Sequence, residues 1–120
     1  MSNIKRKDDR VMKDINSIAM EVIMDAGDGR VKIDEALAAL ALGDLSGAGT
    51  LLKDAENLLV KAHNAQTEVI QNQVSGEDME YSLLFVHAQD TLMTITTELR
   101  MTQKLIPIVG MLLNNKKEDK

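Results

Sequence analysis

The chain has 120 residues, of which 44% are hydrophobic, 28% charged and 2% aromatic, and its net charge is −5. This length fits one domain with an ordinary core, so we expect a single domain over residues 1–120. The acidic balance and the shortage of aromatics exclude a typical nucleic-acid binder, and the absence of cysteine excludes disulfides, thiolate metal sites and a cysteine nucleophile.

The first helix is predicted in the N-terminal third. Apolar residues recur at spacings of three and four between residues 9 and 25, which is the pattern of an amphipathic helix. Gly27 and Gly29 interrupt this pattern, and it resumes from residue 33 to residue 41. We therefore predict a first helix that is kinked or broken at residues 26–29.

The second helix is predicted to begin after a glycine stop signal. Gly43 tolerates a left-handed turn, and the Asp44 carboxylate can accept hydrogen bonds from free backbone N–H groups at a helix start. A helix over residues 45–73 follows, with residues 75–76 ending it and capping the next helix.

The third helix is predicted to start near residues 77–79 and to end at about Met111, with a bend at Pro107. Short loops between three such helices indicate an all-α fold, a three-helix antiparallel bundle. The basic clusters at both ends lie in segments that we expect to be flexible tails, residues 1–8 and 115–120.

The longest strongly apolar segment spans residues 105–113 and is far shorter than the roughly 20 residues that cross a bilayer. The basic N-terminus has no apolar run behind it, so it does not read as a signal peptide. We expect a soluble, cytoplasmic protein.

The third helix carries two stripes of residues. The first stripe is apolar and is predicted to pack against the other two helices; it contains Leu84, Ala88, Leu92, Ile95, Leu99 and Ile106. The second stripe is offset by roughly 130° and is mixed in character; it contains Leu83, His87, Asp90, Thr94 and Met101. Because a three-helix monomer does not need a second semi-apolar face, we predict a homo-oligomer with this stripe near the interface.

His87 is the candidate for chemistry. A neutral imidazole can attack a phosphoryl group through one ring nitrogen while a hydrogen bond holds the other nitrogen. The alternative is an interfacial or core histidine satisfied by a backbone carbonyl, and His63 poses the same question. Asp90 could orient His87, bind a cation, or be an ordinary exposed residue.

Four segments, taken in order and spacing, resemble the lactose/cellobiose-family enzyme IIA of the bacterial phosphoenolpyruvate-dependent sugar phosphotransferase system. They are residues 26–37, 43–45, 62–67 and 87–94, and the resemblance covers roughly residues 18–105. The third segment contains Ala-His-Asn-Ala-Gln-Thr, and the fourth contains His-Ala-Gln-Asp-Thr-Leu-Met-Thr.

The resemblance implies three helices per subunit and a homotrimeric nine-helix bundle. It implies that His87 accepts a phosphoryl group from the histidine-containing phosphocarrier protein and passes it to a cysteine of the cognate IIB unit. Asp90 would be the axial aspartate that coordinates a divalent cation, often Mg²⁺, between subunits. Gln89 would lie beside the phosphoryl site, and His63 matches the family's helix-two histidine.

Some positions depart from the family's pattern. Thr91 stands where members usually have histidine next to the axial aspartate, and the tail at residues 105–113 is unusual. Ala88 favours cellobiose or chitobiose types over lactose types, so we expect a carrier for β-glucoside or disaccharide uptake. The competing hypothesis is a non-catalytic helical interaction or regulatory module, in which His87 and Asp90 only organise an interface.

Overall fold

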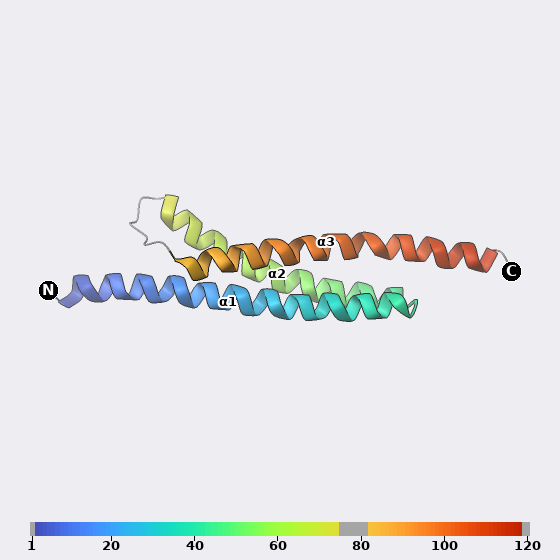
Figure 1. Cartoon of the computed structure of the whole chain (residues 1–120), viewed down its shortest axis with the longest axis horizontal. Coiled ribbons are helices and arrows are strands. Elements are labelled where there is room, and N and C mark those ends of the chain that lie inside the picture. Colours follow the sequence, from blue (N-terminus) through green and yellow to red (C-terminus); the bar gives the residue numbers. More distant parts are fainter. Residues whose placement is uncertain (1, 75–81, 119–120) are drawn as a thin grey trace.

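The computed structural model describes residues 2–74 and 82–118, with side-chain detail for residues 15–71 and 82–116. These residues form three helices, α1 (Ser2–Ala41), α2 (Leu45–Val74) and α3 (Leu83–Glu118). Helices α1 and α3 run in the same direction along an elongated bundle, and α2 runs antiparallel to both (Figure 1). The predicted all-α, three-helix antiparallel bundle is confirmed.

One continuous core joins the three helices. Ile33 of α1, Leu52 of α2 and Ile95 of α3 are its largest fully buried side chains, together with two valines. The stripe of α3 predicted to face the core does so, because Ala88, Leu92, Ile95 and Leu99 are buried and Leu84 and Ile106 pack against the cluster. Apolar spacing of three and four along each helix therefore sets which face is removed from water.

Helix α1 runs without interruption through residues 26–29, so the predicted break is not found and the predicted kink is not confirmed. The physical reason is close packing between α1 and α2. A Cβ added at the buried Gly29 would lie 3.2 Å from the Leu59 Cδ2 atom and 3.6 Å from the Ala55 carbonyl oxygen. Glycine at this position lets the two helices approach, which offsets its cost of about 1 kcal/mol in a helix interior.

The turn between α1 and α2 has the predicted chemistry. Gly43 adopts a φ of 77°, and its N–H donates to the Leu40 carbonyl at 3.0 Å. Asp44 caps α2, because its Oδ1 atom accepts from the Gly47 N–H at 2.9 Å while its carbonyl accepts from the Ala48 N–H at 3.1 Å. The predicted second helix, residues 45–73, is confirmed to within one residue at its end.

Replacing Asp44 with alanine is expected to lower the free energy of unfolding by about 1 kcal/mol, because the first turn of α2 loses its side-chain acceptor. Asp44→Asn keeps an oxygen acceptor and should stay close to wild type. Asp54→Ala, at an exposed position in the interior of α2, is the control and should change stability by less than about 0.5 kcal/mol. Urea denaturation of the four proteins measures this, and equal stability of Asp44→Ala and Asp54→Ala would contradict the capping role.

Ser82 caps the start of α3 and ties it to α1. Its Oγ atom accepts from the Phe85 N–H at 3.1 Å and donates to the Asn16 Oδ1 atom at 2.9 Å. The predicted start at residues 77–79 and the predicted cap at residues 75–76 lie outside the described residues.

The predicted end of α3 at Met111 is wrong, because the helix continues through Pro107 to Glu118. The α1–α2 turn packs against this extension. A Cβ added at Gly43 would lie 3.6 Å from the Leu113 Cδ1 atom, and one added at Gly110 would lie 3.3 Å from the Leu45 Cδ1 atom. These contacts stabilise the C-terminal part of α3, which ends about two turns after the predicted end at Met111.

The flexibility predicted for residues 1–8 and 115–120 stays a prediction, and α1 and α3 extend into these two segments. Among the residues that the structure describes, none of the three helices combines the length and apolar character that crossing a membrane requires.

Candidate functional site

The second stripe of α3 is exposed in the single chain. His87 and Asp90 both lie on the outer face of α3, with Gln89 half-buried at its flank. The buried Ala88 and Leu92 alternate with them and anchor this part of α3 to the core. The 100° step of a helix thus places an imidazole and a carboxylate together on a rigid, accessible face.

The hydroxyl groups of the threonines around His87 donate hydrogen bonds to backbone carbonyls of α3. Thr91 Oγ1 donates to the His87 carbonyl at 2.8 Å, and Thr94 Oγ1 donates to the Asp90 carbonyl at 2.8 Å. Within residues 15–71 and 82–116, no side chain hydrogen-bonds the His87 imidazole. Both ring nitrogens are therefore open to a reactant that approaches from solvent.

Asp90 sits one helical turn from His87 without a hydrogen bond between the two side chains in the described structure. In the same described residues, no group of three or more His, Cys, Asp or Glu side chains is arranged to hold a metal ion. The described part of one chain therefore supplies Asp90 as an isolated carboxylate and builds no complete metal site.

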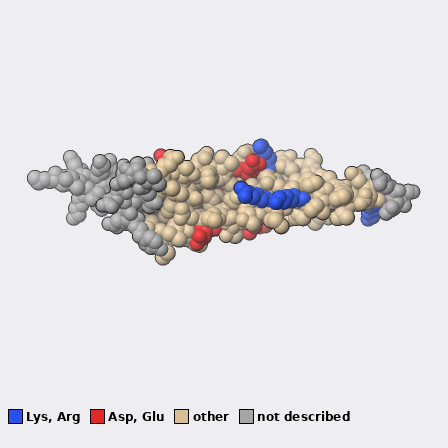
Figure 2. Space-filling model, turned by 90° about the horizontal axis from the view of Figure 1, so that it is seen from above, with Lys and Arg blue, Asp and Glu red and all other residues tan. Residues whose placement is uncertain are grey.

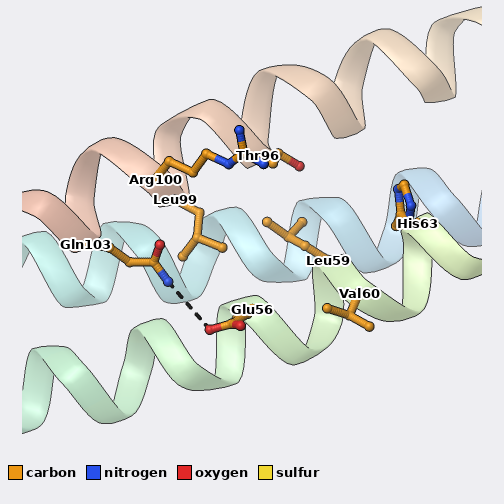
Figure 3. Close-up of a pocket in the computed structure, with 8 residues that line it drawn as sticks. All are labelled: Glu56, Leu59, Val60, His63, Thr96, Leu99, Arg100 and Gln103. Atoms are coloured by element: carbon orange, nitrogen blue, oxygen red, sulfur yellow. Dashed lines mark hydrogen bonds between the residues drawn. The ribbon is translucent and has the colours of Figure 1, made fainter.

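His63 lies in a separate groove of about 330 Å³ between α2 and α3 (Figure 3). Leu59 and Leu99 face the groove, and its remaining lining residues are Glu56, Val60, His63, Thr96, Arg100 and Gln103. Gln103 Nε2 donates to Glu56 Oε2 at 3.5 Å, which joins α2 to α3 at one end.

His87 is not among the residues that line the groove. His63 lies at one end of the groove, and the Glu56–Gln103 pair lies at the other (Figure 3). The groove was not predicted from the sequence. The spacing of Thr96, Arg100 and Gln103 places them on a third face of α3, and this face could have been predicted to lie beside α2.

Arg30, which lies in the first segment of the family resemblance, residues 26–37, has a packing role. Its guanidinium forms two hydrogen bonds with Glu98, at 3.1 Å from Nε to Oε2 and at 2.9 Å from Nη2 to Oε1. This pair joins α1 to α3, and the hydrogen bond raises the pKa of Arg30 above its ordinary value. Both side chains are about two-fifths exposed, so solvent weakens the pair.

The sequence model of the phosphotransferase system lactose/cellobiose-specific IIA subunit matches residues 17–110, which include His63, His87, Gln89 and Asp90. The chain belongs to this family. The resemblance seen in the sequence is thereby confirmed.

Relatives of this IIA chain agree with the assignment. The lichenan-specific phosphotransferase enzyme IIA component of Bacillus subtilis is 42% identical over 96 residues, which cover 80% of this chain and 87% of that protein. The cellobiose-specific enzyme IIA of Bacillus anthracis superposes with a TM-score of 0.77 at 32% identity, covering 82% of this chain and 90% of that chain.

A third relative was solved together with a partner. It is the IIA(Chitobiose) protein of Escherichia coli in its complex with HPr, with a TM-score of 0.68 and 27% identity to this chain. The match covers 82% of this IIA chain and 95% of that chain. This IIA chain is thus a phosphotransferase-system component of the lactose/cellobiose type.

Proposed function

We propose that this IIA chain is a phosphoryl carrier that accepts phosphate on His87 from the phosphocarrier HPr and donates it to a cysteine of a cognate IIB unit. The observation that carries the proposal is the exposed His87 imidazole, open on both nitrogens and held on a helix that is anchored to the core. The complex between the E. coli relative and HPr supports the choice of donor.

The chemistry needs little beyond a well-placed nucleophile. A neutral His87 nitrogen attacks the phosphorus atom of phosphohistidine on the donor, the donor's P–N bond breaks, and the donor imidazole leaves. In the second step the IIB thiolate attacks the same phosphorus and releases neutral His87. Because both partners are proteins, an exposed helix face serves this reaction better than an enclosed cavity. We expect Gln89 to lie beside the phosphoryl site; because it follows His87 by two residues, about 200° around α3, its amide N–H would donate to a phosphoryl oxygen on a neighbouring copy of the chain.

The exposed face of α3 also supports a homotrimer. Leu83 and Met101 are exposed apolar side chains on the same face as His87 and Asp90, and an assembly removes them from water. We propose that three copies pack these faces around a common axis as a nine-helix bundle. In such a trimer, the exposed α3 face of each chain would contact the same face of the two other copies.

A divalent cation at that axis is part of the proposal. Carboxylate oxygens from three copies of Asp90 fit a hard ion such as Mg²⁺, and without an ion the three like charges repel. Thr91, which replaces the family's usual histidine, turns its hydroxyl to the His87 carbonyl, so Asp90 is the ligand that each chain would supply. The ion would supply charge compensation and would take no part in phosphoryl transfer.

Chelation should therefore weaken the wild-type assembly. With EDTA, we expect the wild-type trimer to dissociate at higher protein concentrations than with Mg²⁺, whereas Asp90→Asn should respond to neither addition because its amides do not repel. Asp54→Asn, at an exposed position of α2, is the charge-matched control and should behave like wild type. Sedimentation equilibrium measures the assembly, and a trimer that is indifferent to chelation would contradict the cation.

For the sugar, we propose a β-glucoside or disaccharide, with cellobiose or chitobiose types favoured over lactose. The specificities named for the three relatives described above, lichenan, cellobiose and chitobiose, support this class, while lactose-specific IIA components at 37% identity make lactose the alternative. The IIA chain itself carries only the phosphoryl group, so the sugar is selected elsewhere in the system.

The carrier role is tested by incubating the protein with phosphoenolpyruvate, enzyme I and HPr, and by measuring its intact mass. We expect one added phosphate per chain, lost in acid and kept in alkali, as the P–N bond of phosphohistidine requires. No phosphate under conditions that label a known IIA protein would favour the alternative, a non-catalytic interaction module.

A further inference from the structure

The groove between α2 and α3 is separate from the carrier chemistry, because His87 is not among its lining residues. Its volume of about 330 Å³ is at the small end of the range for pockets that bind small molecules. The floor is apolar, since Leu59 and Leu99 are buried, and polar side chains from both helices form the rims (Figure 3). Such a groove fits a ligand that has both apolar and polar surfaces.

One end of the groove offers positive charge. The exposed Arg100 extends its guanidinium past Thr96, towards the end at which His63 lies (Figure 3). Within residues 15–71 and 82–116, Arg100 forms no ion pair. Its planar guanidinium presents N–H donors that match phosphate oxygens, and His63 in its protonated form adds a further donor and a second charge. This end of the groove therefore fits a phosphate group.

The rest of the surface offers an anion little general attraction. The net charge of the chain is −5. In the described part of the face seen in Figure 2, lysine and arginine side chains are scattered and do not gather into a broad patch. Binding of a phosphate group therefore depends on the local arrangement of Arg100 and His63.

The other end of the groove fits hydroxyl groups. There, Gln103 Nε2 donates to Glu56 Oε2 at 3.5 Å. Glu56 keeps a second carboxylate oxygen that can accept, and the Gln103 amide keeps a second N–H that can donate. Because a hydroxyl group both donates and accepts, a carboxylate beside an amide can hold it. The Glu56 carboxylate also repels an anion, so a bound phosphate group is directed to the Arg100 end.

We propose that this groove binds a sugar phosphate. The phosphate group lies at the Arg100 end, the sugar hydroxyl groups lie at the Glu56–Gln103 end, and an apolar face of the sugar packs on the leucines between them. A free sugar would leave the Arg100 charge unused, and inorganic phosphate would leave the hydroxyl-binding end unused. The inference rests on the function proposed above only for the source of the ligand, because a sugar phosphotransferase system yields sugar phosphates. The groove would let this carrier respond to the product of its system.

The groove and the face of His87 lie on different sides of α3. By the helical step of 100°, the middle of the set Thr96, Arg100 and Gln103 lies roughly 140° around the helix from the middle of His87 and Asp90. Binding in the groove therefore needs neither the His87 imidazole nor a cation at Asp90, and His87→Ala should bind a sugar phosphate as wild type does.

The test is a titration of the full chain with glucose 6-phosphate, glucose and inorganic phosphate, followed by the amide NMR shifts. We expect saturable shifts at the groove residues with glucose 6-phosphate, and an affinity at least about tenfold higher than for either other compound. No binding of glucose 6-phosphate, equal affinity for inorganic phosphate, or shifts that lie away from the groove would overturn the inference. This comparison uses the wild-type chain, so it does not depend on how well a variant folds.

Two charge variants test the position of the phosphate group. Arg100→Gln should lower the affinity for glucose 6-phosphate about tenfold or more, because the charge-assisted hydrogen bonds are lost. Lys104→Gln removes the same charge one turn further along α3, at an exposed position outside the groove, and should bind like wild type. Both variants should keep the helical circular dichroism of wild type. Equal losses in the two variants would indicate unspecific attraction and would overturn the site.

A third variant tests the sugar end. Glu56→Ala should reduce the advantage of glucose 6-phosphate over inorganic phosphate, because the carboxylate that accepts from the sugar is removed. An unchanged advantage would contradict the proposed orientation of the sugar.

These outcomes are distinct from those of the carrier role. A chain that binds glucose 6-phosphate in the groove but takes no phosphate on His87 would refute the carrier role alone. A chain that is labelled on His87 but binds none of the three compounds would refute this inference alone.

Discussion

Replacing His87 with alanine is expected to reduce phosphate incorporation from one phosphate per chain to none. The reason is that the imidazole nitrogen is the nucleophile, and alanine has no group that can replace it. Intact-mass measurement after incubation with phosphoenolpyruvate, enzyme I and HPr gives the stoichiometry directly.

His63→Ala is the matched control, because His63 is the chain's other histidine and is also exposed. It lies in the groove between α2 and α3, whose lining residues do not include His87, and the variant should still take one phosphate. Both variants change exposed side chains and should keep the wild-type melting temperature. Full labelling of His87→Ala, or loss of labelling in His63→Ala alone, would contradict the assignment.

Replacing Ile95 with alanine is expected to have the largest effect on stability. Ile95 is fully buried at the centre of the α3 core stripe, so the substitution removes apolar contacts and leaves a cavity. We expect the free energy of unfolding to fall by about 2–5 kcal/mol. Urea denaturation at one fixed protein concentration measures it, since assembly would make the apparent stability depend on concentration.

Val31→Ala is the control for this prediction. Val31 is exposed on α1, and its substitution should change stability by no more than about 0.5 kcal/mol. If Ile95→Ala and Val31→Ala were equally stable, the packing of α3 against α1 and α2 would be wrong.

Much of the fold follows from the sequence because the residues that a helix buries recur at spacings of three and four. The face of α3 that contains Leu92 and Ile95 was predicted correctly, as was the start of α2 after the turn at Gly43 and Asp44. The break predicted at Gly27 and Gly29 was not found, since a glycine that stops a helix and a glycine that admits a neighbouring helix look alike in one sequence. Gly29 has the second role, against α2.

The extension of α3 was missed for a related reason. Pro107 marks a local obstacle to a helix, but the contacts of Leu113 and Gly110 with the α1–α2 turn depend on tertiary structure. Periodicity along a helix carries no information about which distant turn lies beside it.

One part of the candidate site was predicted from the sequence, and another part was not. The shared face of His87 and Asp90 follows from helix geometry, and the structure places both on it. The groove with His63 and Arg100 depends on the register between α2 and α3, which their packing in the common core sets and the sequence does not state. The homotrimer and its cation need more than one chain, so they stay predictions.

The measurement that tests the carrier role most directly is return of the phosphoryl group. The protein is labelled, separated from enzyme I and phosphoenolpyruvate, and mixed with unphosphorylated HPr, and the intact masses of both proteins are followed. We expect phosphate to leave this IIA chain and to appear on HPr, because the histidine–phosphate bond is similar in both proteins and the transfer is reversible. Phosphate that stays on the IIA chain while HPr remains unlabelled would contradict a carrier role for His87.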